Sequence, residues 1–482
     1  MSYDTVYNKK GQAHQCTEQV LQKLREIVPQ GCSTREIDKV TYSKDYMPIS
    51  LRWFIDGKLP AVPDCIVWPE STDQISRILS VASDEKIPVI PFGDGSGVLG
   101  GAIPVHGGIV VDIKKMDKII DINDSDLLVT AETGINGMIL ERALNQKGYT
   151  LGHIPQSLYC SSLGGWIACK AAGQFSTKYG KIEDILVSLE AVLPNGKIIS
   201  SKPVPRSSTG PAVERLLLGS EGRLGIVTKA SLKIWPYPEK RVLSSFVFDT
   251  LNQSLEAVRK IMRKNVYPAV VRIYDKNETL RHFYEIDEAK EKIMLVLIME
   301  GDSQLVKLEK TLSDQICKEE GGMYCGEKPV KHWLKTRFNV RESSDFTPRG
   351  FIFDTVEISV GWRHAQKLYP AMIEAMRSVK GVVVASAHAS HFYPQGVCFY
   401  FTFGGIPPKK TDPFVFYESI WDKMMQTCID HNGAISHHHG IGLIRGKWLS
   451  KEMQNRFDVL NDIKDTLDPN HIMNPGKMGE KP

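Results

Sequence analysis

Apolar positions along the chain recur with two periods, one typical of helices and one of strands. Residues 16–28 carry an apolar stripe at helical spacing, and residues 72–87 repeat it between the strand-like runs DCIVWPES and PVIPF. Short β-rich runs and one amphipathic helix follow, at residues 107–113, 118–123, 127–134 and 136–148. This mixture predicts an α+β protein.

A break in this pattern falls at the proline-spaced sequence WPYPE, where Pro236 and Pro238 predict a domain boundary. Beyond it, strands and helices alternate in two βαββαβ-like halves, and residues 441–475 are typical of one or two helices that fold back. We therefore expect an N-terminal helical segment (1–60), a first α+β domain (61–240), a cap domain (241–440) and a C-terminal helical segment (441–482) that returns to the first domain.

Composition adds the class of protein and excludes several partners. The 482 residues are 42% hydrophobic and 24% charged, typical of a soluble protein, and a net charge of +4 implies no nucleic-acid partner. The longest apolar run, residues 293–299, is too short to span a bilayer. Nine cysteines without a C-x-x-C pair indicate reduced thiols. MSYDTVYNKK lacks a secretory apolar region and GEKP is no peroxisomal address, so we expect a cytoplasmic protein.

The densest glycine cluster, residues 88–101, contains a formal G-x-G-x-x-G at Gly95, Gly97 and Gly100. Glycines allow successive backbone N–H groups to converge on a pyrophosphate. A Rossmann site would need a helix here and an acidic residue about 20 positions later, whereas residues 102–112 are typical of turn and strand. The loop by itself is therefore either another kind of phosphate cradle or a plain glycine turn.

Further loops rich in glycine and serine follow in a characteristic order. PFGDGSG, SSLGGW, KYGKIEDIL and STGPAVERLLLGSEGRLGIVT resemble the FAD-binding domain of the vanillyl-alcohol-oxidase (PCMH-type) flavoproteins over residues 61–240. The resemblance implies a two-subdomain PCMH-type FAD-binding domain followed by an α+β cap domain with an antiparallel sheet. It also implies non-covalent FAD, because the glycine loop lacks the histidine that tethers the flavin in some members. The implied cofactor contacts are Pro91, Gly93, Asp94, Gly95, Ser96, Gly97, Pro155, Ser157, Ser161, Gly164, Gly165, Trp166, Glu221, Gly225 and Ile226.

Three consecutive histidines, His437, His438 and His439, stand in the sequence SHHHGIG. Imidazoles exchange protons near neutral pH or bind metals, so this triplet predicts a chemical site. Tyr400, in the strand-like run GVCFYFTF, is by itself better explained as a packed core tyrosine, and Arg341 as a surface charge.

These residues gain roles from a narrower resemblance. RSSTGP before LLLGSEG, Tyr400, the sequence TDP and SHHHGIG-x-x-R-x-x-W-L are similar to the alkylglycerone-phosphate synthases. By this resemblance Tyr400 and His437, His438 and His439 are catalytic, and Arg341 binds the substrate. Such enzymes use FAD without net redox change to exchange the acyl group of acyl-dihydroxyacetone phosphate for a fatty alcohol in ether lipid synthesis. We also expect a small lipid-like or hydroxy-acid substrate and a homodimer, and leave a peripheral membrane contact open.

Two further histidines, His388 and His391, leave other functions open. We expect residues other than histidine at the corresponding positions of the alkylglycerone-phosphate synthases. The related D-lactate and glycolate dehydrogenases bind a divalent metal through two histidines and the glutamate of a G-E-H-G motif, which His438 replaces here. We therefore expect no metal, although His388, His391 and His438 are a candidate set. The alternative function is an FAD-dependent D-2-hydroxyacid dehydrogenase, and the third is a non-catalytic flavin-binding or electron-transfer subunit. The triplet and RSSTGP favour the synthase.

Overall fold

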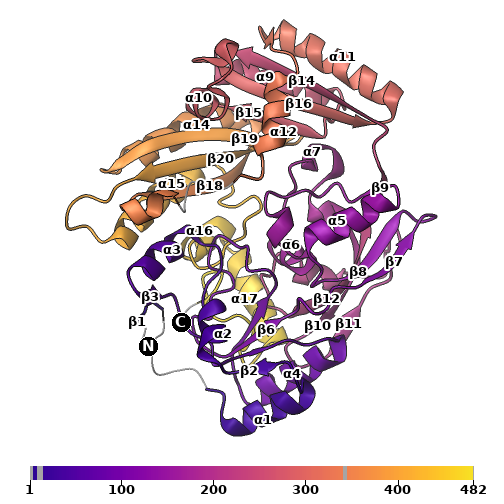
Figure 1. The fold of residues 1–482 in the computed structure, drawn as a ribbon, viewed down its shortest axis with the longest axis vertical. Coiled ribbons are helices and arrows are strands. Elements are labelled where there is room, and N and C mark those ends of the chain that lie inside the picture. Colours follow the sequence, from indigo (N-terminus) through magenta and orange to yellow (C-terminus); the bar gives the residue numbers. More distant parts are fainter. Residues whose placement is uncertain (1–3, 8–14, 340–344, 481–482) are drawn as a thin grey trace.

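The computed structural model describes residues 4–7, 15–339 and 345–480 of the chain. Figure 1 shows two parts stacked along the long axis, with both chain ends in the lower part and the middle of the sequence in the upper part. Among the described residues, no helix is both long and apolar enough to cross a membrane.

The first sheet of the lower part has, in spatial order, β2 (Cys32–Ser33), β4 (Cys65–Val67), β6 (Ile109–Asp112) and β5 (Val89–Phe92). Its helices are α1 (Glu18–Ile27), α2 (Glu36–Thr41), α3 (Pro48–Ile55) and α4 (Thr72–Asp84), and a short ladder pairs β1 (Asp4–Thr5) with β3 (Lys58–Leu59). Helix α4 connects the parallel strands β4 and β5 and begins where the pattern predicts, because the Ser71 hydroxyl accepts a hydrogen bond from the Gln74 N–H.

The second sheet of the lower part is antiparallel and has the order β11 (Ile198–Ser200), β10 (Leu186–Val192), β12 (Ile226–Lys233), β8 (Leu128–Glu132) and β7 (Ile119–Asn123). Its helices are α5 (Gly137–Gln146), α6 (Leu163–Cys169), α7 (Ser176–Tyr179) and α8 (Ile182–Ile185), and β9 (Tyr149–Thr150) pairs with β13 (Trp235–Pro236). Two sheets with their own helices confirm the expected two-subdomain α+β arrangement.

The upper part is built on a seven-stranded antiparallel sheet, which confirms the expected cap architecture. Its order is β17 (Met323–Tyr324), β14 (Lys240–Phe248), β16 (Ile293–Gly301), β15 (Val270–Tyr274), β19 (Val382–Phe392), β20 (Gly396–Gly405) and β18 (Ile352–Gly361). Its helices are α9 (Leu251–Arg263), α10 (Lys276–Phe283), α11 (Ser303–Glu319), α12 (Lys328–Thr336), α14 (Trp362–Arg377) and α15 (Pro413–Asp430). Strand β16 is a continuous apolar run because it is central and contacts both α11 and α12.

The chain then returns to the lower part through α16 (Gly446–Met453) and α17 (Arg456–Leu467), drawn yellow in Figure 1. Beyond α17, the Val89 N–H donates to the Ile472 carbonyl (2.7 Å) and the Asn474 N–H donates to the Val89 carbonyl (2.8 Å). The last segment therefore lies along β5, which leads into the glycine loop. The four expected segment boundaries remain predictions.

Candidate active site

One face of the cap sheet carries a row of chemically active side chains. Strand register places Tyr274 of β15 opposite His388 of β19. In the next two pairs, His388 lies opposite Tyr400 of β20, and Tyr400 lies opposite Glu357 of β18. Because directly opposed residues share a face of a sheet, the four side chains form one row across four strands.

Tyr400 sits inside this row with its hydroxyl held in place. Its ring stacks on His388 with 4.8 Å between the ring centroids, and the Thr355 hydroxyl donates a hydrogen bond to the Tyr400 oxygen at 3.0 Å. Burial raises the pKa of Tyr400 above its ordinary value. The phenol is therefore protonated at neutral pH and can donate a proton.

A β-bulge brings His391 onto the same face as His388. The register of β19 shifts between Ala389 and His391, and an extra residue in one strand resets the alternation of its side chains. His391 Nδ1 lies 2.6 Å from the Ser176 hydroxyl of α7, and its ring stacks on His437 with 4.9 Å between centroids. The bulge thus joins the cap sheet to the lower part and to the triplet.

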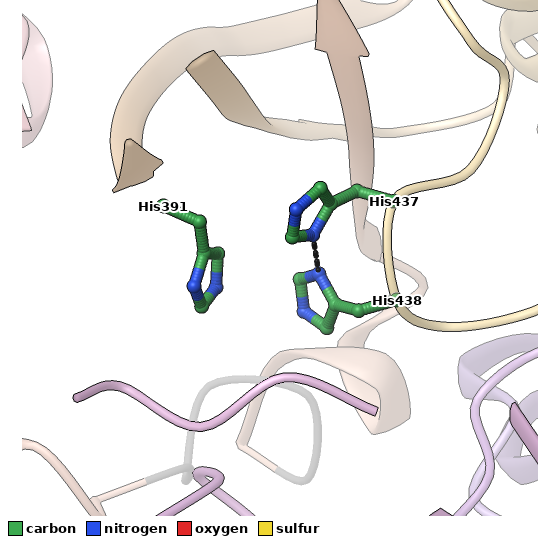
Figure 2. A group of neighbouring side chains, drawn as sticks. All are labelled: His391, His437 and His438. Carbon is green, nitrogen blue, oxygen red and sulfur yellow. Dashed lines mark hydrogen bonds between the residues drawn. The ribbon is translucent and has the colours of Figure 1, made fainter. Parts of the chain in front are cut away.

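A single buried carboxylate holds the loop that carries the triplet. Glu357 Oε1 accepts hydrogen bonds from the backbone N–H groups of His437 (3.2 Å), His438 (3.0 Å) and His439 (2.8 Å). Figure 2 shows the rings of His437 and His438 side by side, with their Nδ1 atoms 2.8 Å apart, facing His391. The carboxylate thus binds only the backbone of these two residues, while the His437 ring contacts His438 through Nδ1 and the Tyr393 hydroxyl through Nε2 (2.7 Å).

Arg445 balances the charge of Glu357. Its Nη1 donates to Glu357 Oε1 at 3.0 Å and its Nη2 donates to Oε2, and both side chains are fully buried. Although burial alone would raise it, Arg445 holds the pKa of Glu357 well below its ordinary value. At the far end of the loop, the carboxylate of Glu221 accepts the N–H groups of Ile441 and Gly442. Two carboxylates therefore fix this loop by its backbone.

The imidazoles of the site are neutral at neutral pH. Burial lowers the pKa of His437 to about 3 and that of His388 to about 4. Burial also holds the pKa of His391 and of His438 well below the usual range. A neutral imidazole can accept a proton or a hydrogen bond, so these groups complement the protonated Tyr400.

The glycine loop forms a cradle beside a buried hydroxyl. A Cβ atom at Gly93 would overlap Ser162 Oγ, and this buried oxygen has no hydrogen-bond partner in the described part of the chain. Gly95 adopts a φ of +68°, which favours glycine, and Asp94 accepts a hydrogen bond from Asn136 at 3.0 Å. Unhindered backbone next to an unpaired hydroxyl fits a bound cofactor such as FAD.

The predicted cofactor contacts lie on loops that the fold brings together. Pro91 lies against the turn at Gly222, where an added Cβ would approach the proline ring to 2.8 Å. An added Cβ at Gly165 would lie 3.5 Å from the Ser162 hydroxyl. Trp166 is buried and donates its indole N–H to the Ser161 hydroxyl at 2.8 Å. The structure therefore gathers residues 91–97, 155–166 and 221–226 around one region.

Arg341 lies outside the described residues. Within the described part of the chain, His391, His437 and His438 have ligand nitrogens within 4.8 Å of one another (Figure 2). His388 is absent from this group, and its Nδ1 lies 3.5 Å from a carboxylate oxygen of Glu278. The fold thus brings together a different set of three histidines from the candidate metal set.

Glu357 and Arg445 were missed as functional residues by sequence analysis. Glu357 interrupts the apolar strand FDTVEISVGW, and Arg445 is the arginine of SHHHGIG-x-x-R-x-x-W-L. A charged residue at a buried strand position is a usable signal, because such residues are rarely buried unless paired. The identity of the partner, however, is invisible in the sequence.

Comparisons with known proteins identify the family. Residues 63–202 match the FAD binding domain family, and residues 237–478 match the C-terminal domain of FAD linked oxidases. The chain is 30% identical to the alkyldihydroxyacetonephosphate synthase of Caenorhabditis elegans, over 86% of this chain and 76% of that protein. It is also 30% identical to the uncharacterized FAD-linked oxidoreductase YgcU of Escherichia coli K12, over 86% of this chain and 88% of that protein.

A solved structure of an alkyldihydroxyacetonephosphate synthase shares this fold. The TM-score is 0.82 at 24% sequence identity, and the match covers 98% of this chain and 89% of that chain. The cradle at the glycine loop agrees with the cofactor that both matched families bind. The chain therefore belongs to the FAD-linked oxidases and is an enzyme of that family with FAD as its cofactor.

Proposed function

We propose that the protein is an enzyme of the alkylglycerone-phosphate synthase type, which exchanges the acyl group of acyl-dihydroxyacetone phosphate for a fatty alcohol. The observation that carries this proposal is a protonated phenol next to neutral imidazoles. The Tyr400 ring lies 6.3 Å from that of His438 and 5.5 Å from that of His439, measured between centroids. The exchange breaks one C–O bond and forms another without net electron transfer, so it depends on proton donors and acceptors at the reacting carbon.

The proton roles follow from the charge states of these groups. In this proposal Tyr400 protonates the departing acyloxy oxygen, because a tyrosine phenol is protonated at neutral pH. The neutral imidazoles of His437, His438 and His439 accept the proton that the incoming alcohol loses. The imidazolium then returns this proton to the Tyr400 phenolate, so the proton of the alcohol replaces the one given to the released fatty acid and the reaction balances. In this proposal Arg341 binds the substrate.

We place FAD against the glycine loop at residues 93–97 and against Ser161, Gly164, Gly165 and Ile226. When bound, FAD supplies a redox-active ring system that can lend and recover an electron pair. The attachment is non-covalent in this proposal because residues 88–101 contain no histidine. Acid precipitation should therefore release all of the flavin, and flavin that stays with the precipitate would contradict this point.

The second candidate is an FAD-dependent D-2-hydroxyacid dehydrogenase. The cluster of His391, His437 and His438 favours it, because three convergent imidazoles can hold a divalent metal or supply a base. We expect the synthase to be active in a chelator and without a bound metal. About one equivalent of zinc or manganese, with activity lost on chelation, would support the dehydrogenase.

An anaerobic flavin experiment separates the two functions. A dehydrogenase must pass two electrons to its flavin, so D-lactate, glycolate or D-2-hydroxyglutarate should bleach the flavin band near about 450 nm. We expect no bleaching, and we expect an ether product with release of fatty acid from an acyl-dihydroxyacetone phosphate and a long-chain alcohol. His438→Ala or His439→Ala should stop this exchange and leave FAD bound. Stoichiometric bleaching by one hydroxy acid without ether formation would establish the dehydrogenase.

The proposal extends to the surroundings of the enzyme. A cytoplasmic homodimer with a peripheral membrane contact would suit substrates that are lipid-like small molecules. Light scattering of the holoenzyme tests the dimer, and co-sedimentation with phosphatidylcholine vesicles tests the membrane contact. A monomer that stays in the supernatant would contradict both the dimer and the membrane contact, and it would leave the proposed chemistry of the site unchanged.

A further inference from the structure

Two arginines stack on one tryptophan near Tyr274, at one end of the row of side chains on the cap sheet. Arg272 lies on β15, and Arg337 follows directly after α12. The guanidinium carbons lie 5.6 Å (Arg272) and 5.5 Å (Arg337) from the ring centroid of Trp333, which is buried. Both arginines are half-buried, so their charges are partly removed from water.

Neither arginine has an anionic partner in the described part of the chain. Arg272 Nε donates to the Tyr274 hydroxyl at 2.8 Å, and Arg337 Nη1 donates to the Gln174 side-chain oxygen at 3.1 Å. Arg337 Nε is buried without any partner among the described residues. Burial and nearby Arg241 lower the pKa of Arg337 to about 10, as expected for a guanidinium that lacks a carboxylate.

The neighbouring Arg241, by contrast, has its charge balanced by a carboxylate. Its guanidinium forms an ion pair of 2.6 Å with Glu300. Both Arg241 and Arg337 lie over the Phe175 ring, at 5.6 and 5.2 Å from its centroid. Stacking on aromatic rings contributes about 0.5–2 kcal/mol per cation. It does not neutralise the charge, so two of these three arginines require an anion from elsewhere.

The unpaired arginines lie near His388 and His391 of the candidate site. Arg272 and Tyr274 point to the same face of β15, and Tyr274 lies opposite His388. On the other side, Gln174 contacts Arg337, and the nearby Ser176 hydroxyl lies 2.6 Å from His391 Nδ1. The charge of Arg272 also contributes, after burial, to the lowered pKa of both histidines.

We propose that Arg272 and Arg337 form the anion-binding subsite for the phosphate monoester of the substrate. A phosphate monoester carries close to two negative charges at neutral pH and offers three acceptor oxygens, which match two guanidinium forks. A single carboxylate would leave one of the two charges unbalanced. The naming of the substrate rests on the proposed function, whereas the affinity for phosphate rests on the arginine pair alone.

Equilibrium binding to the purified holoenzyme tests this subsite, with dihydroxyacetone phosphate and inorganic phosphate as probes and acetate and D-lactate as carboxylate controls. Calorimetry should detect both phosphates. Arg272→Gln and Arg337→Gln should each weaken binding by about 10- to 100-fold, from about 1.5–3 kcal/mol per charged hydrogen bond. The exposed Arg263 of α9 provides the matched control, since Arg263→Gln should bind as the native protein does.

Native-like phosphate binding by either Gln variant would overturn the subsite, as would carboxylates that bind as tightly as phosphate. Flavin absorbance and melting temperature establish that each variant is folded. If Arg337→Gln does not fold, Arg337→Lys retains the charge and loses the fork, and it should still weaken binding. Phosphate binding that depends on both arginines without any ether product would keep the subsite and reject the synthase. Ether formation that neither substitution changes would support the synthase and reject the subsite.

Discussion

Arg445 and Arg337 illustrate two ways in which this protein buries a guanidinium. Arg445 is fully buried, and the Glu357 carboxylate accepts hydrogen bonds from both of its terminal nitrogens. Arg337 is half-buried, stacks on aromatic rings and has no carboxylate within ion-pair distance among the described residues. An arginine balanced from within the chain serves the architecture, whereas an unbalanced one beside reactive side chains is suited to bind an anion.

The same contrast separates the frame of the site from its reactive groups. Glu357 and Glu221 are buried carboxylates that bind backbone N–H groups of the triplet loop. The imidazoles of His437 and His438 hydrogen-bond to each other, His437 Nε2 also bonds the Tyr393 hydroxyl, and neither ring is hydrogen-bonded to Glu357 or Glu221. The loop is therefore rigid at its backbone while its rings can exchange protons.

The largest effect should come from breaking the internal pair. Arg445→Met leaves the Glu357 carboxylate buried without its counter-charge, so the free energy of unfolding should fall by about 3–5 kcal/mol. Urea denaturation of the holoenzyme, followed by flavin fluorescence, measures this loss. Arg337→Met is the matched control and should cost less, about 1–2 kcal/mol from the lost stacking on Trp333 and the lost Gln174 hydrogen bond, because it removes no ion pair. Equal losses in the two variants would remove the distinction between structural and ligand-binding arginines.

A smaller loss, confined to turnover, should follow from Tyr400→Phe. The variant keeps the ring and its stacking on His388 but removes the hydroxyl that Thr355 positions. Turnover should fall by about 10²-fold or more if this hydroxyl transfers a proton, while the melting temperature and flavin spectrum barely change. Tyr237→Phe, at an exposed position, should be fully active. An equally active Tyr400→Phe enzyme would return Tyr400 to the role of a packed core residue.

The last effect concerns the dependence of stability on pH. The folded-state pKa values of His437 (about 3), His388 (about 4) and His153 (about 3) are depressed by burial, so these groups stabilise the fold above their unfolded pKa. This contribution should be lost as pH falls from about 6.5 towards about 4, because the unfolded chain binds protons first. Thermal melts across this range should show a falling melting temperature.

His153→Phe provides the matched variant for this pH series. His153 is buried against Trp166, with 4.6 Å between ring centroids, and neither ring nitrogen has a partner among the described residues. The substitution keeps an aromatic ring and removes one titrating group, so the melting temperature should depend less steeply on acid pH. An unchanged slope would show that His153 does not contribute to the acid sensitivity.

The sequence was sufficient for many local features of the fold. The helix α4, the strands β6–β8, the helix α5 and the apolar strand β16 all lie where periodicity predicts them. FAD was also correctly predicted as the cofactor, because the order of the glycine-rich motifs is a property of the chain itself. The assignment of roles to Tyr400 and the triplet stays a prediction, although the fold does bring these residues together.

The candidate metal set shows why local patterns do not suffice for a site. Three positions apart, His388 and His391 would lie on opposite faces of a regular strand, but the bulge in β19 puts both on one face, and only His388 lies beside the Glu278 carboxylate. His391 instead joins His437 and His438. Such differences depend on one extra residue in a strand, which the alternation of side chains does not reveal.

The sequence by itself therefore determined the local elements and the choice of FAD as cofactor, because periodicity, glycine content and motif order are properties of neighbouring residues. Only the tertiary structure decided which charges are balanced. Glu357 and Arg445 are separated by 88 positions and meet only because the chain returns past β18 after α15. Arg272 and Arg337 are equally ordinary in the sequence, and only the packing of both against Trp333, without an ion pair to a described carboxylate, leaves their charges unbalanced.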